Sequence, residues 1–133
     1  MSSDVGLPTA TQVEDARRVI ADVLDPTPTV TLSLRGRGVL TKLESLQSVG
    51  SFKVRGALAA VAAARREDSS GAVIASSAGN HGLGIAHAAN LLGVRATVVV
   101  PSNASSVKVE KLRRYDIELI QTGDSYDDAQ AYA

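Results

Sequence analysis

The chain has 133 residues, 44% of them hydrophobic and 21% charged, so it is long and apolar enough to bury a globular core. Its 14 basic and 14 acidic residues balance, which argues against a nucleic-acid partner. Cysteine is absent and only 2 histidines occur, so we expect no disulfide, no thiolate nucleophile and no metal centre.

The N-terminus and the longest apolar run bear on where the protein works. Residues 1–18 lack the basic start and the apolar core of a secretory signal. The longest apolar run, Ala57–Ala64, is too short and too rich in alanine to span a bilayer. We therefore expect no membrane partner, and a cytoplasmic location fits the absence of cysteine.

The first half of the chain predicts two helices with extended segments between them. Apolar residues near helical spacing predict a helix over Thr11–Leu24, and two prolines then force an extended path through Asp25–Val30. Gly38–Glu44 has the pattern of a strand. After a short turn, Ser51 is the expected N-cap of an alanine-rich helix that continues to about Arg66.

The second half alternates short buried strands with helices. Strands are predicted over Ala72–Ser76, Arg95–Val100 and Ile117–Gln121. Helices are predicted over Ile85–Leu92, which Gly93 ends, over Asn103–Tyr115, and from about residue 123 onward. This alternation predicts an α/β fold with a parallel sheet, whose strand-to-helix loops meet at one edge where ligands bind. Because the sequence stops inside the last helix, we expect a chain truncated at its C-terminus.

The loop after the Ala72–Ser76 strand, with the sequence SSAGNHGLG, predicts an anion site. Free backbone N–H groups and the helix dipole both favour negative charge there, and Ser77 and Asn80 add donors. The glycine spacing is the reverse of the dinucleotide fingerprint, and no acidic residue ends the next strand, so that interpretation fails. A purely structural role, in which Gly82 and Gly84 let helix and strand approach closely, remains an alternative.

Lys53 lies just inside the helix that Ser51 is expected to open. A cation is disfavoured there because the helix dipole repels it, whereas a neutral or covalently engaged amine avoids that repulsion. Nucleophilic lysines in enzymes meet this description. A lysine that simply extends into water is the ordinary alternative, and Lys53 alone does not separate the two.

Two motifs in order, GSFKVRGA at residues 50–57 and SSAGNHG at residues 76–82, change that balance. Through these motifs the chain resembles the pyridoxal-phosphate-dependent threonine and serine dehydratases. The resemblance extends through four further stretches, KLESLQSVGSFK, VVVP, KVEKLRRY and GDSYDDA. The resemblance runs from about Thr27 to the last residue. It implies the three-layer αβα parallel-sheet fold of the type II pyridoxal-phosphate enzymes, the tryptophan synthase β-like class, represented by its N-terminal portion only. Residues 1–72 would belong to the large cofactor domain, and residues 73–133 to an incomplete small substrate-binding domain.

The resemblance also implies roles for the residues in these motifs. Lys53 would bind pyridoxal 5′-phosphate covalently and later remove the α-proton of the substrate. Phe52 would pack against the cofactor ring, and Asn80 would hydrogen-bond its phenolic oxygen. The glycine-rich phosphate cradle and the group that faces the pyridine nitrogen would lie beyond this chain.

The same resemblance assigns the anion site of the glycine-rich loop to the carboxylate of the substrate. Ser77, Asn80, His81 and the backbone amide of Ala78 would hold it. The implied substrate is an amino acid, and the implied full-length protein is a homo-oligomer.

The implied reaction is dehydration and deamination of L-threonine or L-serine to a 2-oxo acid and ammonia. A serine racemase, or a dehydratase of another hydroxyamino acid, is an alternative, although racemases of this kind generally have serine at position 78, where this chain has Ala78. His81 argues against the cysteine synthase branch. A non-catalytic truncated fragment that binds small anions or partner chains is an alternative of another class.

Overall fold

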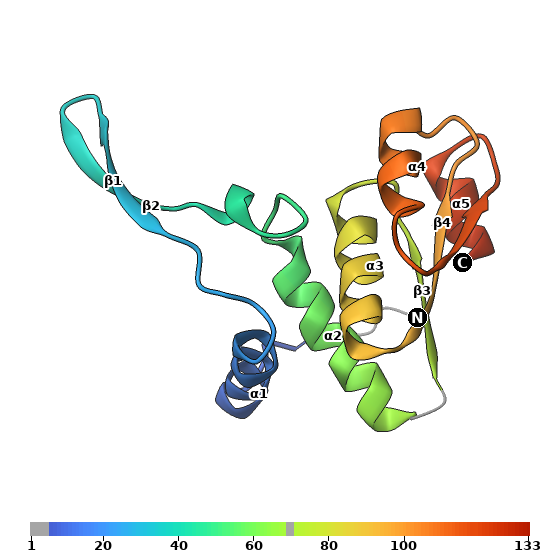
Figure 1. Cartoon of the computed structure of the whole chain (residues 1–133), viewed down its shortest axis with the longest axis horizontal. Coiled ribbons are helices and arrows are strands. Elements are labelled where there is room, and N and C mark those ends of the chain that lie inside the picture. Colours follow the sequence, from blue (N-terminus) through green and yellow to red (C-terminus); the bar gives the residue numbers. More distant parts are fainter. Residues whose placement is uncertain (1–5, 69–70) are drawn as a thin grey trace.

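A computed structural model describes residues 6–68 and 71–133 of the chain (Figure 1). The elements in order are α1 (Ala10–Ala21), β1 (Thr29–Leu34), β2 (Arg37–Lys42), a 3₁₀ turn (Glu44–Leu46), α2 (Lys53–Glu67), β3 (Ala72–Ser76), α3 (Asn80–Leu92), β4 (Arg95–Val100), α4 (Ser106–Leu112), β5 (Glu118–Gln121) and α5 (Tyr126–Tyr132). Within the described ranges, no helix is long and apolar enough to cross a membrane.

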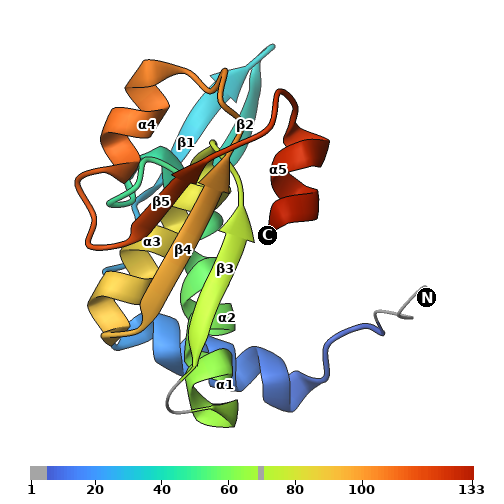
Figure 2. The same cartoon turned by 90° about the vertical axis from the view of Figure 1, so that its right-hand side faces the viewer.

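The central layer is a parallel sheet in the order β3-β4-β5 (Figure 2). Helices α3 and α4 lie on one side of this sheet and α5 lies on the other (Figure 1). Val98, Val99 and Val100 of β4 are fully buried, as expected for a central strand that is covered on both faces. The predicted three-layer α/β fold with a parallel sheet is therefore confirmed, and the predicted bounds of β3 and β4 match the observed ones.

Helices α2 and α3 pack side by side and share one hydrophobic cluster. Val54, Leu58 and Val61 of α2 contact Ile85 and Ala88 of α3 in that cluster. Gly93 ends α3 with a φ of 64°, the left-handed conformation predicted for a C-terminal glycine. Packing against α2 and the sheet thus compensates for the two glycines inside α3, which are poor helix formers.

An antiparallel hairpin of β1 and β2 was not predicted. Its turn contains Arg35 and Gly36, with φ values of 50° and 76°, as in the two-residue turns that match the twist of paired strands. Strand β1 was not predicted, because the two prolines before it indicated only an extended path. The register places Leu32 opposite Val39, and the hairpin projects away from the parallel sheet (Figure 1).

Several predicted element bounds are corrected by the structure. Ser51 is not the N-cap of α2, which begins after Phe52, and within the described residues no side chain caps this helix. Helix α3 begins at Asn80, ahead of the predicted Ile85, because burial in the sheet-helix interface overrides the weak propensity of its first turn. Helix α4 covers only the middle of its predicted range, since Ser105 is the N-cap.

Glu44, in the 3₁₀ turn, is the centre of a polar network on the first turn of α2. Its carboxylate accepts two hydrogen bonds from Arg55, at 2.8 and 2.9 Å, and one from the Thr27 hydroxyl at 2.6 Å. These hydrogen bonds, first from Arg55 and then from Thr27, lower the pKa of Glu44 from 4.5 to about 2. The carboxylate therefore stays ionised well into the acid range.

This network predicts a specific loss of stability in acid. The pKa of Glu44 is lower in the folded state, so the unfolded state binds more protons between the two values. Its stabilising contribution is fully present above pH 4.5 and is lost as the pH falls toward about 2. Urea unfolding at several pH values should show Glu44→Gln to be destabilised at pH 6 and to approach the wild type near pH 2. A difference that does not change with pH would contradict this.

Two glycines of the helices make a matched pair for a stability test. A Cβ at Gly82 would lie 2.1 Å from the carbonyl oxygen of Ser77, whereas a Cβ at Gly56 meets nothing within 4 Å. Gly82→Ala should destabilise the fold by about 1–3 kcal/mol through overpacking. Gly56→Ala should stabilise it by about 1 kcal/mol through helix propensity. Thermal unfolding of both variants measures this, and equal shifts of the same sign would contradict the packing account.

Candidate functional site

The predicted site residues lie at one end of the molecule. Strand β3 ends at Ser76, and the loop that follows it leads directly into α3 at Asn80. Helix α2 begins at Lys53, and both helices start at the end where β3 and β4 finish (Figure 1). This is the carboxyl edge of the parallel sheet, the edge at which α/β proteins bind ligands.

Gly84 brings α3 against the first turn of α2. A Cβ at this position would lie 3.2 Å from the carbonyl oxygen of Lys53 and 3.3 Å from the Cβ of Ala57. Gly82 is tighter still, because its Cβ would overlap the carbonyl group of Ser77. Both glycines therefore permit close approach, Gly84 between α3 and α2 and Gly82 between α3 and the loop after β3, and this role is compatible with an anion site.

The N-terminus of α3 presents free backbone donors. Gly79 is the N-cap, and its carbonyl oxygen accepts the first intrahelical hydrogen bond, from Leu83 at 3.2 Å. The N–H groups of Asn80, His81 and Gly82 precede that bond and have no acceptor inside the helix. No side chain in the described part of the chain caps this end. Together with the helix dipole, these groups favour an anion.

Ser77 is fixed in the loop by two hydrogen bonds. Its backbone N–H donates to the carbonyl of Val99 at 3.1 Å, and its hydroxyl accepts from the N–H of Gly79 at 3.2 Å. The residue is half-buried, and Ala78 beside it packs against the cluster under β4 and α4. Asn80 and His81 are exposed. The loop therefore has a defined backbone while two of its polar side chains remain accessible.

Lys53 and Phe52 stand together at the start of α2. The Nζ of Lys53 lies 5.0 Å from the centre of the Phe52 ring, over its face, which is a cation–π arrangement. Both side chains are exposed, and Phe52 retains 58% of its accessible surface. An exposed amine beside an exposed aromatic face leaves room for a planar ligand at this position.

Buried hydroxyls without partners occur in both segments of the site. The Oγ of Ser51 and the Oγ of Ser76 are buried and find no hydrogen-bond partner within residues 6–68 and 71–133. Ser51 directly precedes Phe52, and Ser76 directly precedes Ser77. Unsatisfied buried polar groups are rare and concentrate where a protein stores strain or binds something.

A contact between Ser48 and His87 was not predicted from the sequence. Ser48 Oγ and His87 Nε2 lie 3.0 Å apart, and the ring of His87 meets that of Tyr115 edge to face at 5.8 Å. Burial lowers the pKa of His87 and raises that of Tyr115. No sequence signal connects residues this far apart, so only the packing of the loop before α2 on α3 reveals them.

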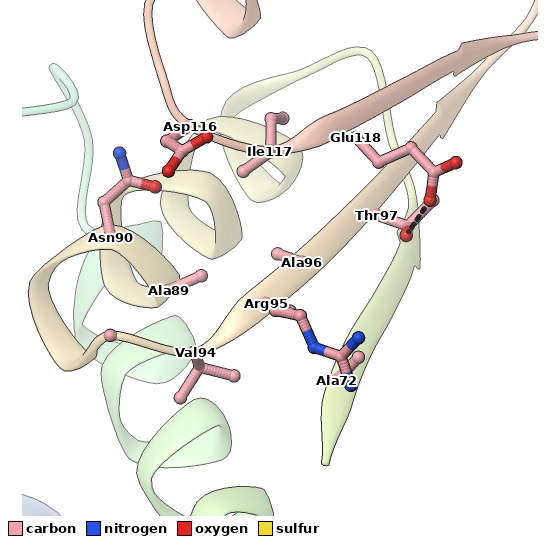
Figure 3. Close-up of a pocket in the computed structure, with 11 residues that line it drawn as sticks. Ala72, Ala89, Asn90, Val94, Arg95, Ala96, Thr97, Asp116, Ile117 and Glu118 are labelled. Atoms are coloured by element: carbon pink, nitrogen blue, oxygen red, sulfur yellow. Dashed lines mark hydrogen bonds between the residues drawn. The ribbon is translucent and has the colours of Figure 1, made fainter. Parts of the chain in front are cut away.

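A cavity of about 560 Å³ lies at the opposite end of the sheet (Figure 3). It is lined by the end of α3 and by the beginnings of β4 and β5, where Thr97 donates a hydrogen bond to Glu118 at 2.8 Å. None of the predicted site residues lines it. Its position at the amino ends of the strands separates it from the free N-terminus of α3.

Comparison with known proteins places the chain among close relatives. It is 44% identical to the biosynthetic L-threonine dehydratase of Pasteurella multocida over 98 residues, which are 74% of this chain and 19% of that protein. It is 35% identical to the L-threonine ammonia-lyase of Thermotoga maritima over 125 residues, which are 91% of this chain and 31% of that protein.

Solved structures show the same fold. A threonine deaminase from T.th. matches with a TM-score of 0.81 and 35% identity, over 95% of this chain and 41% of that one. The serine racemase of Dictyostelium discoideum matches with a TM-score of 0.81 and 32% identity, over 93% of this chain and 42% of that one. The chain thus spans less than half the length of each protein it is compared with.

The family assignment rests on most of the chain and not on isolated motifs. The sequence profile described as pyridoxal-phosphate dependent enzyme matches residues 20–133, a range that contains Lys53, the SSAGNHG loop and the whole parallel sheet. The chain belongs to the pyridoxal-phosphate dependent enzyme family.

Proposed function

We propose that this chain is the part of a pyridoxal-phosphate-dependent dehydratase that carries the cofactor lysine and the carboxylate site of the substrate. The substrate is L-threonine or L-serine, and the products are a 2-oxo acid and ammonia. One observation carries the proposal: the backbone of Lys53 packs against Gly84 of helix α3. The N-terminus of α3 has no side-chain cap and directly follows the Ser77 loop. The names of the related dehydratases and ammonia-lyases support the proposal.

The residues of this chain fit the cofactor. The exposed amine of Lys53 is the group that reacts with an aldehyde, and the exposed face of Phe52 beside it suits a planar aromatic ring. Asn80 supplies an exposed amide that donates to a ring oxygen. The unpartnered hydroxyls of Ser51 and Ser76 lie in the same two segments, as in a site completed by a polar ligand.

In the proposed mechanism, the amine of Lys53 would hold the cofactor and, when free, would accept the α-proton of the substrate. Pyridoxal phosphate supplies the electron sink that makes this proton acidic. Ser77 Oγ, the N–H of Ala78 and the N–H groups at the start of α3 orient the substrate by its carboxylate. Asn80 and His81 add side-chain donors at the same place.

The proposal also covers organisation beyond the residues of the site. We propose that residues 1–72 belong to the large cofactor domain and residues 73–133 to the small substrate-binding domain. The hydrophobic cluster of α2 and α3 contains residues from both sides of that division. A homo-oligomer of the complete protein is part of the same proposal.

Racemisation of serine is the second candidate function. A serine racemase and a threonine deaminase match the fold of this chain equally well, each with a TM-score of 0.81. Ala78 favours dehydration: its methyl group carries no proton to deliver to the opposite face of the substrate. The ratio of 2-oxo acid to D-serine formed from L-serine separates the two functions. A large excess of 2-oxo acid supports dehydration, and comparable amounts of D-serine would support the racemase.

Lys53→Ala should abolish covalent attachment of pyridoxal phosphate, because no other amine occupies the start of α2 beside Phe52. The measurement is borohydride fixation followed by peptide mass spectrometry, on protein expressed from its complete reading frame. Lys108→Ala, which removes an exposed lysine of α4, is the matched control and should retain attachment at Lys53. Attachment to the Lys53→Ala variant at the level of the control would rule out the assignment.

A further inference from the structure

The carboxylate of Glu44 connects the first turn of α2 to the segments that precede it. Arg55 Nε donates to Oε2 at 2.8 Å, and Arg55 Nη2 donates to Oε1 at 2.9 Å. Oε1 also accepts from the hydroxyl of Thr27 at 2.6 Å, and Lys42 Nζ lies 3.7 Å from it. The two bonds from Arg55 form a bidentate pair, which fixes the orientation of both groups as well as their distance.

The partners of Glu44 come from separate parts of the chain. Thr27 is buried between the two prolines that follow α1, and its carbonyl oxygen accepts from Lys42 Nζ at 3.0 Å. Lys42 ends β2, and the next residue, Leu43, donates from its backbone to Pro28 at 2.9 Å. The side chain of Glu44 therefore contacts three parts of the chain: the segment that follows α1, the end of β2 and the first turn of α2.

Lys53 is the first residue of the turn that Glu44 holds. Arg55 follows it by two residues, and the N–H of Arg55 donates to the carbonyl of Phe52 at 3.1 Å. The start of α2 has no side-chain cap among the described residues, so the usual means of fixing a helix N-terminus is missing here. The Glu44–Arg55 pair supplies a side-chain anchor in its place.

Charge and burial strengthen this anchor. A carboxylate is favoured beside a helix N-terminus, where the guanidinium of Arg55 alone would oppose the dipole. The side chains of Glu44 and Arg55 are 20% and 26% exposed, so solvent screens them less than a surface pair. The Glu110–Arg113 pair of α4, at 2.7 Å, has 62% and 57% exposure and serves as a comparison.

We propose that Glu44 is a positioning residue for Lys53: through Arg55 it fixes the first turn of α2 and presents the lysine amine beside the N-terminus of α3. This inference rests on the proposed function, in which Lys53 carries the cofactor. Glu44 touches neither cofactor nor substrate in this account and acts only through Arg55.

The test compares Glu44→Gln, Arg55→Gln and their double variant with Glu110→Gln as the matched control, in protein expressed from its complete reading frame. One readout is the rate at which pyridoxal phosphate becomes fixed to Lys53 by borohydride, measured by peptide mass spectrometry. The second is hydrogen exchange of the first turn of α2 relative to that of β4, which reports local order independently of the cofactor.

Glu44→Gln and Arg55→Gln should each slow fixation at Lys53 by about tenfold, the effect of losing one hydrogen bond between charged groups. The double variant should be no slower than either single one, because the two residues act as one pair. Exchange should rise more in the first turn of α2 than in β4, whose exchange changes only by the loss of global stability. The Glu110→Gln control should behave as the wild type in both readouts.

Three results would overturn the inference, and they differ in what they imply for the proposed function. Normal fixation at Lys53 in Glu44→Gln, or slower fixation with exchange rising equally in β4, would leave Glu44 without a positioning role while the proposed function stands. Failure of the wild type to fix pyridoxal phosphate at Lys53 in preference to other lysines would overturn the proposed function and this inference with it.

Discussion

Helix α3 packs so closely on the first turn of α2 that a side-chain atom at Gly84 would lie 3.2 Å from the carbonyl oxygen of Lys53. A glycine favours this approach, because a Cβ there would push its neighbours apart by a few tenths of an ångström, and the shared cluster of Val54, Leu58 and Ile85 holds it in place. Because both helices start at the carboxyl edge of the sheet, their N-termini lie at the same end of the molecule. Lys53 and the free N-terminus of α3 thus come together from two separate segments.

The electrostatics of this end follow from that arrangement. Two helix N-termini create positive potential, which favours a carboxylate ligand. The acidic side chain of Glu44 balances the charge that Arg55 adds at the start of α2. The segments around Lys53 and Ser77 therefore share one environment at the carboxyl edge of the sheet.

Much of the fold and the main site segments could be predicted from the sequence. The continuous apolar runs of β3 and β4 gave correct bounds, and Gly93 marked the end of α3. Of these two strands, both predicted to be buried, only the central β4 is, because β3 lies at the edge of the sheet and its Ile74 is half-exposed. The start of α3 at Asn80 could not be predicted, since glycines argue against a helix until the packing surface is known.

Other features depended on contacts between residues distant in sequence. The hairpin was missed because β1 follows two prolines, and its pairing with β2 depends on the turn at Arg35 and Gly36. Ser51 has the right residue type for an N-cap, but its hydroxyl is buried beside the helix start and does not cap it. The Ser48–His87 and Glu44–Arg55 contacts required the folded chain.

The central claim is that ligand binds where the first turns of α2 and α3 meet. Amide chemical shifts of the cofactor-loaded protein, recorded during titration with L-serine under conditions that prevent turnover, test it most directly. The account predicts saturable shifts at Ala78, Asn80 and His81, with little change around the cavity at Thr97 and Glu118. Saturable shifts confined to that cavity, with the start of α3 unaffected, would contradict the account.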